Sequence, residues 1–266
     1  MPITEVPGSL LDWTLLDLTP PWDPAAGTIV FQHGLGANQQ VWAEWLPHLI
    51  GRYRILRFDM RGHGRSGAEP GAALDMEVLT DDLFAVMDAA GVERAHLVGE
   101  SIGGTIVLNA ALRHPDWVAT LTVCNGAHRG GSIQAVHDWQ RIIDDSGMEG
   151  WSTQMMGCRF FDGGIPDGLR RWYHREQAKT DPDVLLRGVA ALVGADLDDR
   201  LEQVRPPVLL IHPDSSPFIP VEVMAEFQRG VPDGRLHVIG RARHGMPVSH
   251  AATCAALLRD FLAEKG

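Results

Sequence analysis

Short apolar runs alternate with longer segments of helical periodicity along the first half of the chain. The short runs have the length of buried strands, and the longer segments place apolar residues three or four positions apart, as on one face of a helix. Strands that alternate with helices form a mostly parallel sheet covered on both faces. The expected strands are Leu10–Leu18 (an edge strand or a hairpin arm), Thr28–Phe31, Arg54–Phe58, Ala95–Val98 and Val118–Cys124, and the expected helices are Val41–Ile50, the segment with Leu79, Leu83 and Met87, and Thr105–Arg113.

This alternation stops after Gly126 and resumes near residue 205. The segment between is rich in Trp and Met and has no clear strand, which is typical of a helical cap over a pocket at the strand ends. The sequence therefore predicts an α/β core of residues 1–126 and 205–266 and a helical cap of residues 127–204. The expected cap helices are Ile133–Ser146, Asp167–Lys179 and Asp183–Val193, and the later core elements are strands Pro207–Ile211 and Leu236–Ile239 and helices Val221–Arg229 and Ala251–Glu264.

Composition narrows the classes of partner and compartment. The 45% hydrophobic content is ample for a large core, and the net charge of −11 argues against nucleic acid or an anionic membrane as the main partner. The first residues lack the basic and apolar stretches of a signal peptide, and no run of about 18 apolar residues would span a membrane. Three cysteines without metal-type spacing suit a reducing compartment. We expect a cytoplasmic protein; its oligomeric state stays open.

Gly62, Gly64 and Gly67 form a G-x-G-x-x-G sequence directly after an expected strand. A dinucleotide site also needs a helix that opens at the third glycine. Here Pro70 and Gly71 follow, so no helix can begin at Gly67. We therefore expect no nucleotide cofactor, and no metal.

The segment Gly99–Gly104, with the sequence GESIGG, joins an expected strand to an expected helix. A strand that becomes a helix within about two residues leaves Ser101 on a tight turn, beside the free N–H groups of the helix start. The glycines suit this turn because a side chain there would crowd the crossing backbones. Ser101 is thus the candidate nucleophile.

A serine nucleophile needs a base and donors for the developing oxyanion. His244 lies in a loop beyond the last expected strand, where it can reach back to the same sheet edge. His250 is the rival, but it sits at the start of the last helix, where capping or packing is its expected duty. The expected oxyanion donors are the backbone N–H groups of Ile102 and Leu35, while His33 is expected to be structural.

These segments together resemble the α/β-hydrolase family over nearly the whole chain. The matching segments are His33–Gly36 with Trp42, Phe58–Ser66, Gly99–Gly104 and His244–Pro247. Within the family the chain is most similar to the 3-oxoadipate enol-lactonase-like group, through the opening loop, the arginine-glycine segment and the cap length. The resemblance implies an α/β-hydrolase fold, a mostly parallel doubly wound sheet with an inserted α-helical cap.

The third member of the triad departs from the family's pattern. The family places an aspartate after the penultimate strand, in a segment ending Asp-Pro-x-x-Pro. Alignment of the two prolines puts Ser216 at that position, and Asp214 is the only carboxylate in the loop. Asn125 offers no carboxylate after the earlier strand, and Glu100 should point away from the histidine. By elimination, Asp214 is the expected acid.

The resemblance implies a metal-free and cofactor-free hydrolase of a small ester or lactone, with a 3-oxoadipate enol-lactonase-like activity as the finer expectation. The alternatives are a C–C bond hydrolase or a cofactor-independent dioxygenase on the same fold, and a non-catalytic ligand-binding homologue. The acyl-pocket candidates are Trp42, Trp139, Met155 and Phe160, and the candidates for holding a substrate carboxylate are Arg129, Arg141 and Arg159.

Overall fold

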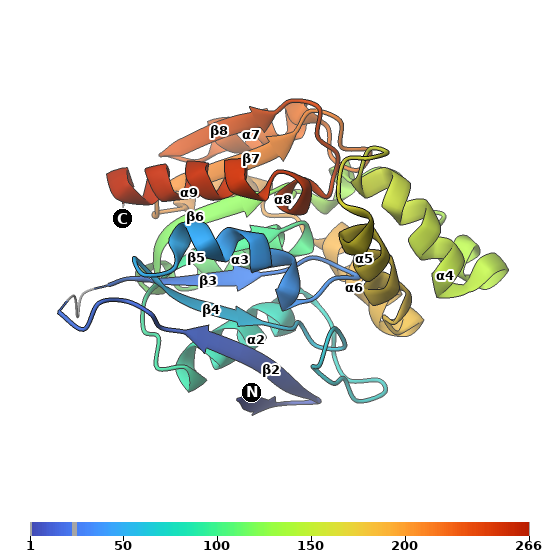
Figure 1. The fold of residues 1–266 in the computed structure, drawn as a ribbon, viewed down its shortest axis with the longest axis horizontal. Helices are drawn as coiled ribbons and strands as arrows, with labels where there is room; N and C mark the ends of the chain where they lie inside the picture. The colour runs from blue at the N-terminus through green and yellow to red at the C-terminus, as the bar shows by residue number, and fades with distance from the viewer. Residues whose placement is uncertain (1, 23–25, 266) are drawn as a thin grey trace.

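One eight-stranded sheet forms the centre of the protein in a computed structural model that describes residues 2–22 and 26–265. The strand order is β1-β2-β4-β3-β5-β6-β7-β8. The strands β1 and β2 form an antiparallel hairpin, and β2 also pairs antiparallel with β4. The other six strands, β4-β3-β5-β6-β7-β8, are parallel to one another, which confirms the mostly parallel sheet (Figure 1). The strands are β1 (Ile3–Val6), β2 (Ser9–Leu16), β3 (Thr28–Gln32), β4 (Arg54–Phe58), β5 (Ala95–Glu100), β6 (Val118–Cys124), β7 (Val208–Pro213) and β8 (Gly234–Ile239).

Helices cover both faces of this sheet, as expected for a doubly wound arrangement. On one face lie the 3-10 turn Gln39–Trp45, α1 (Leu46–Leu49) and α9 (Ala251–Lys265). On the other lie α2 (Met76–Ala89), α3 (Ile102–Arg113) and α7 (Val221–Gly230). Each face therefore encloses its own hydrophobic cluster, and the central strands β3, β5, β6 and β7 between them are buried on both sides.

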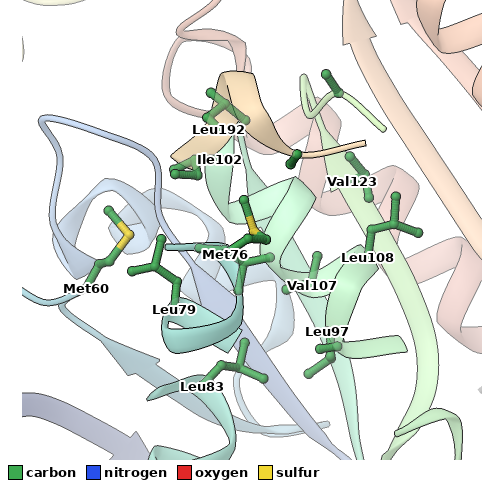
Figure 2. Close-up of a cluster of buried hydrophobic side chains, with 14 of the residues drawn as sticks. Met60, Met76, Leu79, Leu83, Leu97, Ile102, Val107, Leu108, Val123 and Leu192 are labelled. Atoms are coloured by element: carbon green, nitrogen blue, oxygen red, sulfur yellow. The ribbon is translucent and has the colours of Figure 1, made fainter. Parts of the chain in front are cut away.

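The larger hydrophobic cluster supports the turn between β5 and α3. It includes Leu97 of β5, Ile102 and Leu108 of α3, and Val123 of β6, all fully buried (Figure 2). Close-packed interiors have low compressibility, so the turn at residue 101 sits on a rigid base.

Three helices occupy the chain between β6 and β7: α4 (Trp139–Arg159), α5 (Asp167–Ala178) and α6 (Pro182–Gly194). Figure 1 shows them together beyond the carboxyl ends of the parallel strands. The expected bounds of α5 and α6 are close to those observed. No helix in the described part of the chain is long and apolar enough to cross a membrane.

Two sequence expectations about these elements were wrong in detail. The helix expected at Ile133–Ser146 begins only at Trp139 and continues to Arg159, through a kink at Gly147. The backbone before it is irregular, and Gln134 there donates its N–H to the carbonyl of Phe218 (2.9 Å) instead of to a helical partner. The segment expected as the single helix Val41–Ile50 is a 3-10 turn followed by one short α-helical turn.

The strand expected at Leu10–Leu18 is a hairpin arm. It is observed as β2, which pairs with β1 on one side and with β4 on the other, so β1 and not β2 forms the edge of the sheet. The short β1 carried too little apolar pattern to be recognised from the sequence.

Candidate active site

Ser101 stands on a strained turn between β5 and α3. Its backbone has φ 58° and ψ −125°, a region that a residue with a Cβ rarely occupies and that costs of the order of 1–3 kcal/mol. The turn is held by hydrogen bonds from Ser101 N–H to the Cys124 carbonyl (3.0 Å) and from Gly104 N–H to the Ser101 carbonyl (2.9 Å). Strain that is held in place at one serine is typical of a nucleophile elbow.

Glycines beside Ser101 are required by close backbone contacts. A Cβ on Gly99 would lie 2.1 Å from the carbonyl oxygen of Gly103, and a Cβ on Gly103 would lie 2.4 Å from that of Gln32. Because no side chain fits at these distances, the sequence at this turn is dictated by the crossing of strand and helix.

The loop after β3 lies directly against the nucleophile. A Cβ on Gly34 would be 3.0 Å from the Ser101 Cβ, and Leu35 lines the same cavity as Ser101. His33 fixes this loop: its Nδ1 lies 2.8 Å from the Gly34 carbonyl, and its Nε2 accepts the Met60 N–H at 2.9 Å. Burial lowers the pKa of His33 to about 4, so the ring is neutral and can accept that bond.

The N–H groups of Leu35 and Ile102 remain the candidate oxyanion donors. Ile102 is the first residue of α3, so its N–H has no acceptor within the helix. Both residues belong to the segments that frame Ser101, and Ile102 is fully buried. The positive end of the helix also favours negative charge at this place.

His244 reaches the same cavity from the loop after β8. The residue is 4% exposed, and Phe218 packs edge-on against its ring with centroids 4.7 Å apart. Its backbone carbonyl accepts a hydrogen bond of 2.6 Å from the Asn125 side chain, which follows β6. The structure therefore brings Ser101 and His244 to one cavity, whereas the rival His250 bonds through Nδ1 to Ser249 instead.

Asp214, the acid chosen by elimination, does not partner His244 in the structure. Its carboxylate is exposed and accepts the backbone N–H groups of Arg241 (2.8 Å) and Ala242 (3.1 Å). These bonds lower the pKa of Asp214, and the bond from the Arg241 N–H contributes most. They also hold the turn in which Arg241 has φ 57°. The expectation was wrong because the carboxylate is bound by backbone N–H groups of the turn after β8 and makes no hydrogen bond to His244 among the described residues.

Ser216 occupies the position next to His244. Its Oγ lies 3.4 Å from the His244 Nδ1, a long contact, and it accepts the N–H groups of Phe218 and Ile219, each at 3.3 Å. Two backbone donors therefore converge on the side chain at position 216. The side-chain neighbour of the His244 Nδ1 is thus an uncharged hydroxyl and not a carboxylate.

The cavity shared by Ser101 and His244 is small and mostly apolar. Its free volume of about 20 Å³ has room for little more than one water, so substrate binding requires the lining side chains to move. The lining residues are Leu35, Ser101, Ala127, Ile133, Val136, Trp139, Arg159, Val189, Leu192, Phe218, Ile219 and His244.

Only one of the four aromatic and methionine candidates lines this cavity. Trp139 does, from the start of α4. Trp42 is fully buried on the face of the sheet that α9 covers, where its ring centroid lies 4.7 Å from that of Phe31. Met155 packs in the larger hydrophobic cluster, on the other face. Phe160 lies against Tyr173, with ring centroids 5.3 Å apart. The expectation that these three residues line the pocket was wrong. They pack in the hydrophobic clusters, where large apolar side chains are most often found.

Arg159, one of three arginine candidates, is the one that reaches the cavity. It is the last residue of α4 and 3% exposed. Arg129 pairs with Asp198 and Glu226, and Arg141 is an exposed residue paired with Asp138. The sequence held no means of ranking the three, since burial depended on the fold of the cap.

Comparisons with known proteins agree along nearly the whole chain. A family model described as alpha/beta hydrolase fold matches residues 27–188. The chain is 29% identical to "Putative carbamate hydrolase RutD" of Caulobacter sp. (strain K31), over 88% of this chain and 90% of that protein. It is 28% identical to 2-hydroxymuconate semialdehyde hydrolase of Pseudomonas sp. (strain CF600), over 91% and 89%.

The solved structures include the enol-lactonase from Burkholderia xenovorans LB400. That structure superposes with a TM-score of 0.87 at 25% sequence identity, and the match covers 98% of this chain and 100% of the enol-lactonase. An elbow serine, a loop histidine and an inserted helical segment are thus found in a chain whose full length resembles hydrolases.

Proposed function

Because the chain belongs to the α/β-hydrolase fold family, we propose that this hydrolase cleaves a small ester or lactone through an acyl-enzyme on Ser101. The observation that carries the proposal is the strained backbone of Ser101 in a cavity that it shares with His244. Backbone strain of this kind is concentrated at active sites, and at a serine it is typical of the nucleophile of a hydrolase.

The proposed reaction begins when the Ser101 Oγ attacks the substrate carbonyl and His244 takes the hydroxyl proton. The oxyanion of the tetrahedral intermediate receives hydrogen bonds from the N–H groups of Ile102 and Leu35. His244 then donates the proton to the leaving oxygen as the C–O bond breaks, which yields the acyl-enzyme. A water molecule, deprotonated by His244, attacks the acyl carbonyl and restores Ser101. In a lactone the leaving oxygen stays attached to the acyl chain.

A lactone is the finer substrate class that we favour, and within it an enol-lactone, as expected from the resemblance to the 3-oxoadipate enol-lactonase-like group. The support is the likeness to an enol-lactonase structure over the whole chain. In this proposal residues 127–204 form the cap, because α4 and α6 supply Trp139, Arg159, Val189 and Leu192 to the cavity.

A C–C bond hydrolase is the second candidate. It is supported by the 28% identity to a 2-hydroxymuconate semialdehyde hydrolase over 91% of the chain. The two candidates differ in the bond that is broken, so a 2-hydroxymuconate semialdehyde substrate tested beside a small lactone separates them.

Covalent labelling tests the nucleophile directly. Incubation with a fluorophosphonate should modify the protein once, on Ser101, and should abolish hydrolysis of p-nitrophenyl acetate in proportion to the label. Peptide mass spectrometry locates the adduct. Hydrolysis that persists in the fully labelled protein, or a label on another serine, would rule out the proposed mechanism.

The pH profile should extend further into the acid range than that of an ordinary histidine base. Burial lowers the pKa of His244 well below its usual 6.5, helped by the cation of Arg159 on α4 and by His212 on β7. A base must be neutral, so activity is lost only as the pH falls through this lowered pKa. We expect kcat/KM to stay above about half of its maximum at about pH 6. An acid limb at or above pH 6.5 would contradict this expectation.

A further inference from the structure

The end of α4 is bound to the loop that carries His244. The carbonyl of Arg159, the last residue of α4, accepts the N–H of Gly245 at 2.9 Å. Phe160 packs so closely on Gly245 that a Cβ at that glycine would lie 2.3 Å from the phenylalanine ring. The backbone of Arg159 is therefore fixed against the histidine loop, and its side chain starts from a defined position.

The guanidinium of Arg159 extends from there to the loop after β3. Its Nη2 donates to the carbonyl of Leu35 (2.9 Å), and its Nε donates to Gln177 Oε1 of α5 (2.7 Å). Its Nη1 lies 3.6 Å from Glu100 Oε1, in an ion pair whose two side chains are almost fully buried. A planar guanidinium with contacts at all three nitrogens is held in one orientation, and so is the carbonyl that it binds.

The N–H and the carbonyl of Leu35 belong to two successive peptide planes. The plane that contains the N–H is held from the core, because its carbonyl, that of Gly34, lies 2.8 Å from His33 Nδ1. The plane that contains the Leu35 carbonyl is held by Arg159. A plane bound at one atom can still rotate, and the second anchor opposes that rotation. The direction of the Leu35 N–H thus depends on Arg159 as well as on His33.

The helices α4 and α6 also pack on this loop with apolar contacts. A Cβ on Gly36 would lie 3.0 Å from the ring of Trp151 on α4. A Cβ on Gly188 of α6 would lie 2.5 Å from the side chain of Leu35. Apolar contacts fix where the loop lies but have no preferred direction for a carbonyl. The hydrogen bond from Arg159 supplies that direction.

We propose that Arg159 is a positioning residue for the reaction on Ser101: its guanidinium orients the loop whose Leu35 N–H binds the oxyanion. The inference rests on the proposed function and adds a residue to its machinery. In the first step the Ser101 Oγ adds to the substrate carbonyl carbon, its proton passes to His244, and the carbonyl oxygen becomes the oxyanion. In this role Arg159 acts through Leu35 and forms no bond to the substrate.

This role predicts a loss in the transition state alone. The oxyanion forms only as Ser101 attacks, so a misdirected N–H weakens transition-state binding and leaves binding of the intact ester unchanged. An arginine that bound the ester itself would change KM instead. The expected effect is large, because a displacement of about 1 Å in a positioned group can cost about 100-fold in rate.

Arg159→Met removes the hydrogen bond to Leu35 and keeps an unbranched side chain. We expect kcat for p-nitrophenyl acetate to fall by about 100-fold, with KM within about threefold of the wild type. Arg141→Met, at an exposed position of the same helix, is the matched control and should keep kcat within about twofold. Thermal midpoints report whether both variants are folded.

A transition-state analogue distinguishes positioning from a general structural role. The Ser101 hydroxyl adds to the carbonyl of 1,1,1-trifluoro-2-butanone, and the hemiketal oxygen then occupies the place of the oxyanion. In Arg159→Met its inhibition constant should rise by about the factor by which kcat/KM falls. A rise below about threefold beside a much larger fall in kcat/KM, or an effect confined to KM, would overturn the proposal.

A second pair of variants leaves the buried ion pair intact, since Arg159→Met deprives Glu100 of its cation and could impair folding. Gln177→Leu removes the acceptor that holds Nε, and it should lower kcat by about tenfold, the effect of one lost hydrogen bond. Gln177→Glu keeps an acceptor at this place and should restore kcat to within about threefold of the wild type. Equal kcat values in the two variants would refute the positioning role.

Failure of this inference is distinguishable from failure of the proposed function. Ser101-dependent hydrolysis that Arg159→Met and Gln177→Leu both retain in full would overturn only the role of Arg159. A wild-type protein without Ser101-dependent hydrolysis would contradict the proposed function itself.

Discussion

Ser101→Ala should lower kcat/KM for p-nitrophenyl acetate by about three orders of magnitude or more. The variant keeps the Cβ and hence the turn with φ 58°, but it removes the oxygen that forms the acyl-enzyme. The remaining oxyanion donors can accelerate only attack by water, which is slow without the covalent step. Initial rates and the loss of fluorophosphonate labelling measure the effect.

A second serine provides the control for this substitution. Ser146→Ala, on α4, removes a hydroxyl that donates a hydrogen bond to the carbonyl of Ile142 within its own helix, and it should leave activity within about twofold. The thermal midpoints of both variants should lie within a few degrees of the wild type, about the shift that 1 kcal/mol produces in a chain of this size. A Ser101→Ala protein that retains more than about a tenth of the activity would disprove the serine mechanism.

Ser216→Asp should increase turnover of neutral esters by about 100-fold. The position is already fitted for a carboxylate, because the N–H groups of Phe218 and Ile219 converge on the side chain and Nδ1 of His244 lies 3.4 Å away. An aspartate there would accept a hydrogen bond from the Nδ1–H of His244, fix the tautomer in which Nε2 is the base, and stabilise the imidazolium. In other triads the corresponding charge contributes about 10⁴ in turnover.

The same variant changes the pH profile in a defined direction. A carboxylate beside His244 raises the pKa of that histidine, so the acid limb of kcat/KM should move to higher pH. A folded Ser216→Asp protein with unchanged or lower turnover would refute the role given to position 216.

Asp214→Asn is the matched control on the same loop. The carboxylate of Asp214 accepts backbone N–H groups from Arg241 and Ala242 and makes no contact with His244 among the described hydrogen bonds and ion pairs. We expect its loss to change kcat/KM by less than about threefold. A fall of several orders of magnitude would restore Asp214 as the acid.

The sequence determined the parts of this protein that depend on neighbouring residues. Gly99, Ser101 and Gly103 specify the turn between a strand and a helix, because only glycine tolerates a backbone within 2.1–2.4 Å of its absent Cβ. The alternation of strands and helices likewise gave the parallel sheet, since each apolar run must be buried by the element that follows it. The family resemblance could also be recognised from the sequence, because each matching segment is a short, contiguous run of residues. It agrees with the comparisons with known hydrolases.

Only the tertiary structure decided which side chain partners His244 and which ones line the cavity. Asp214 and Ser216 lie two residues apart in one loop, and the choice between them depended on where the N–H groups of Arg241 and Ala242 came to lie after β8. The sequence offered three arginines as candidates for the cavity. Arg159 lines it because the end of α4 packs against the loop of Leu35, to whose carbonyl Arg159 donates a hydrogen bond. A residue's type is local, but the donors, acceptors and charges around it come from distant segments, and those neighbours set what it does.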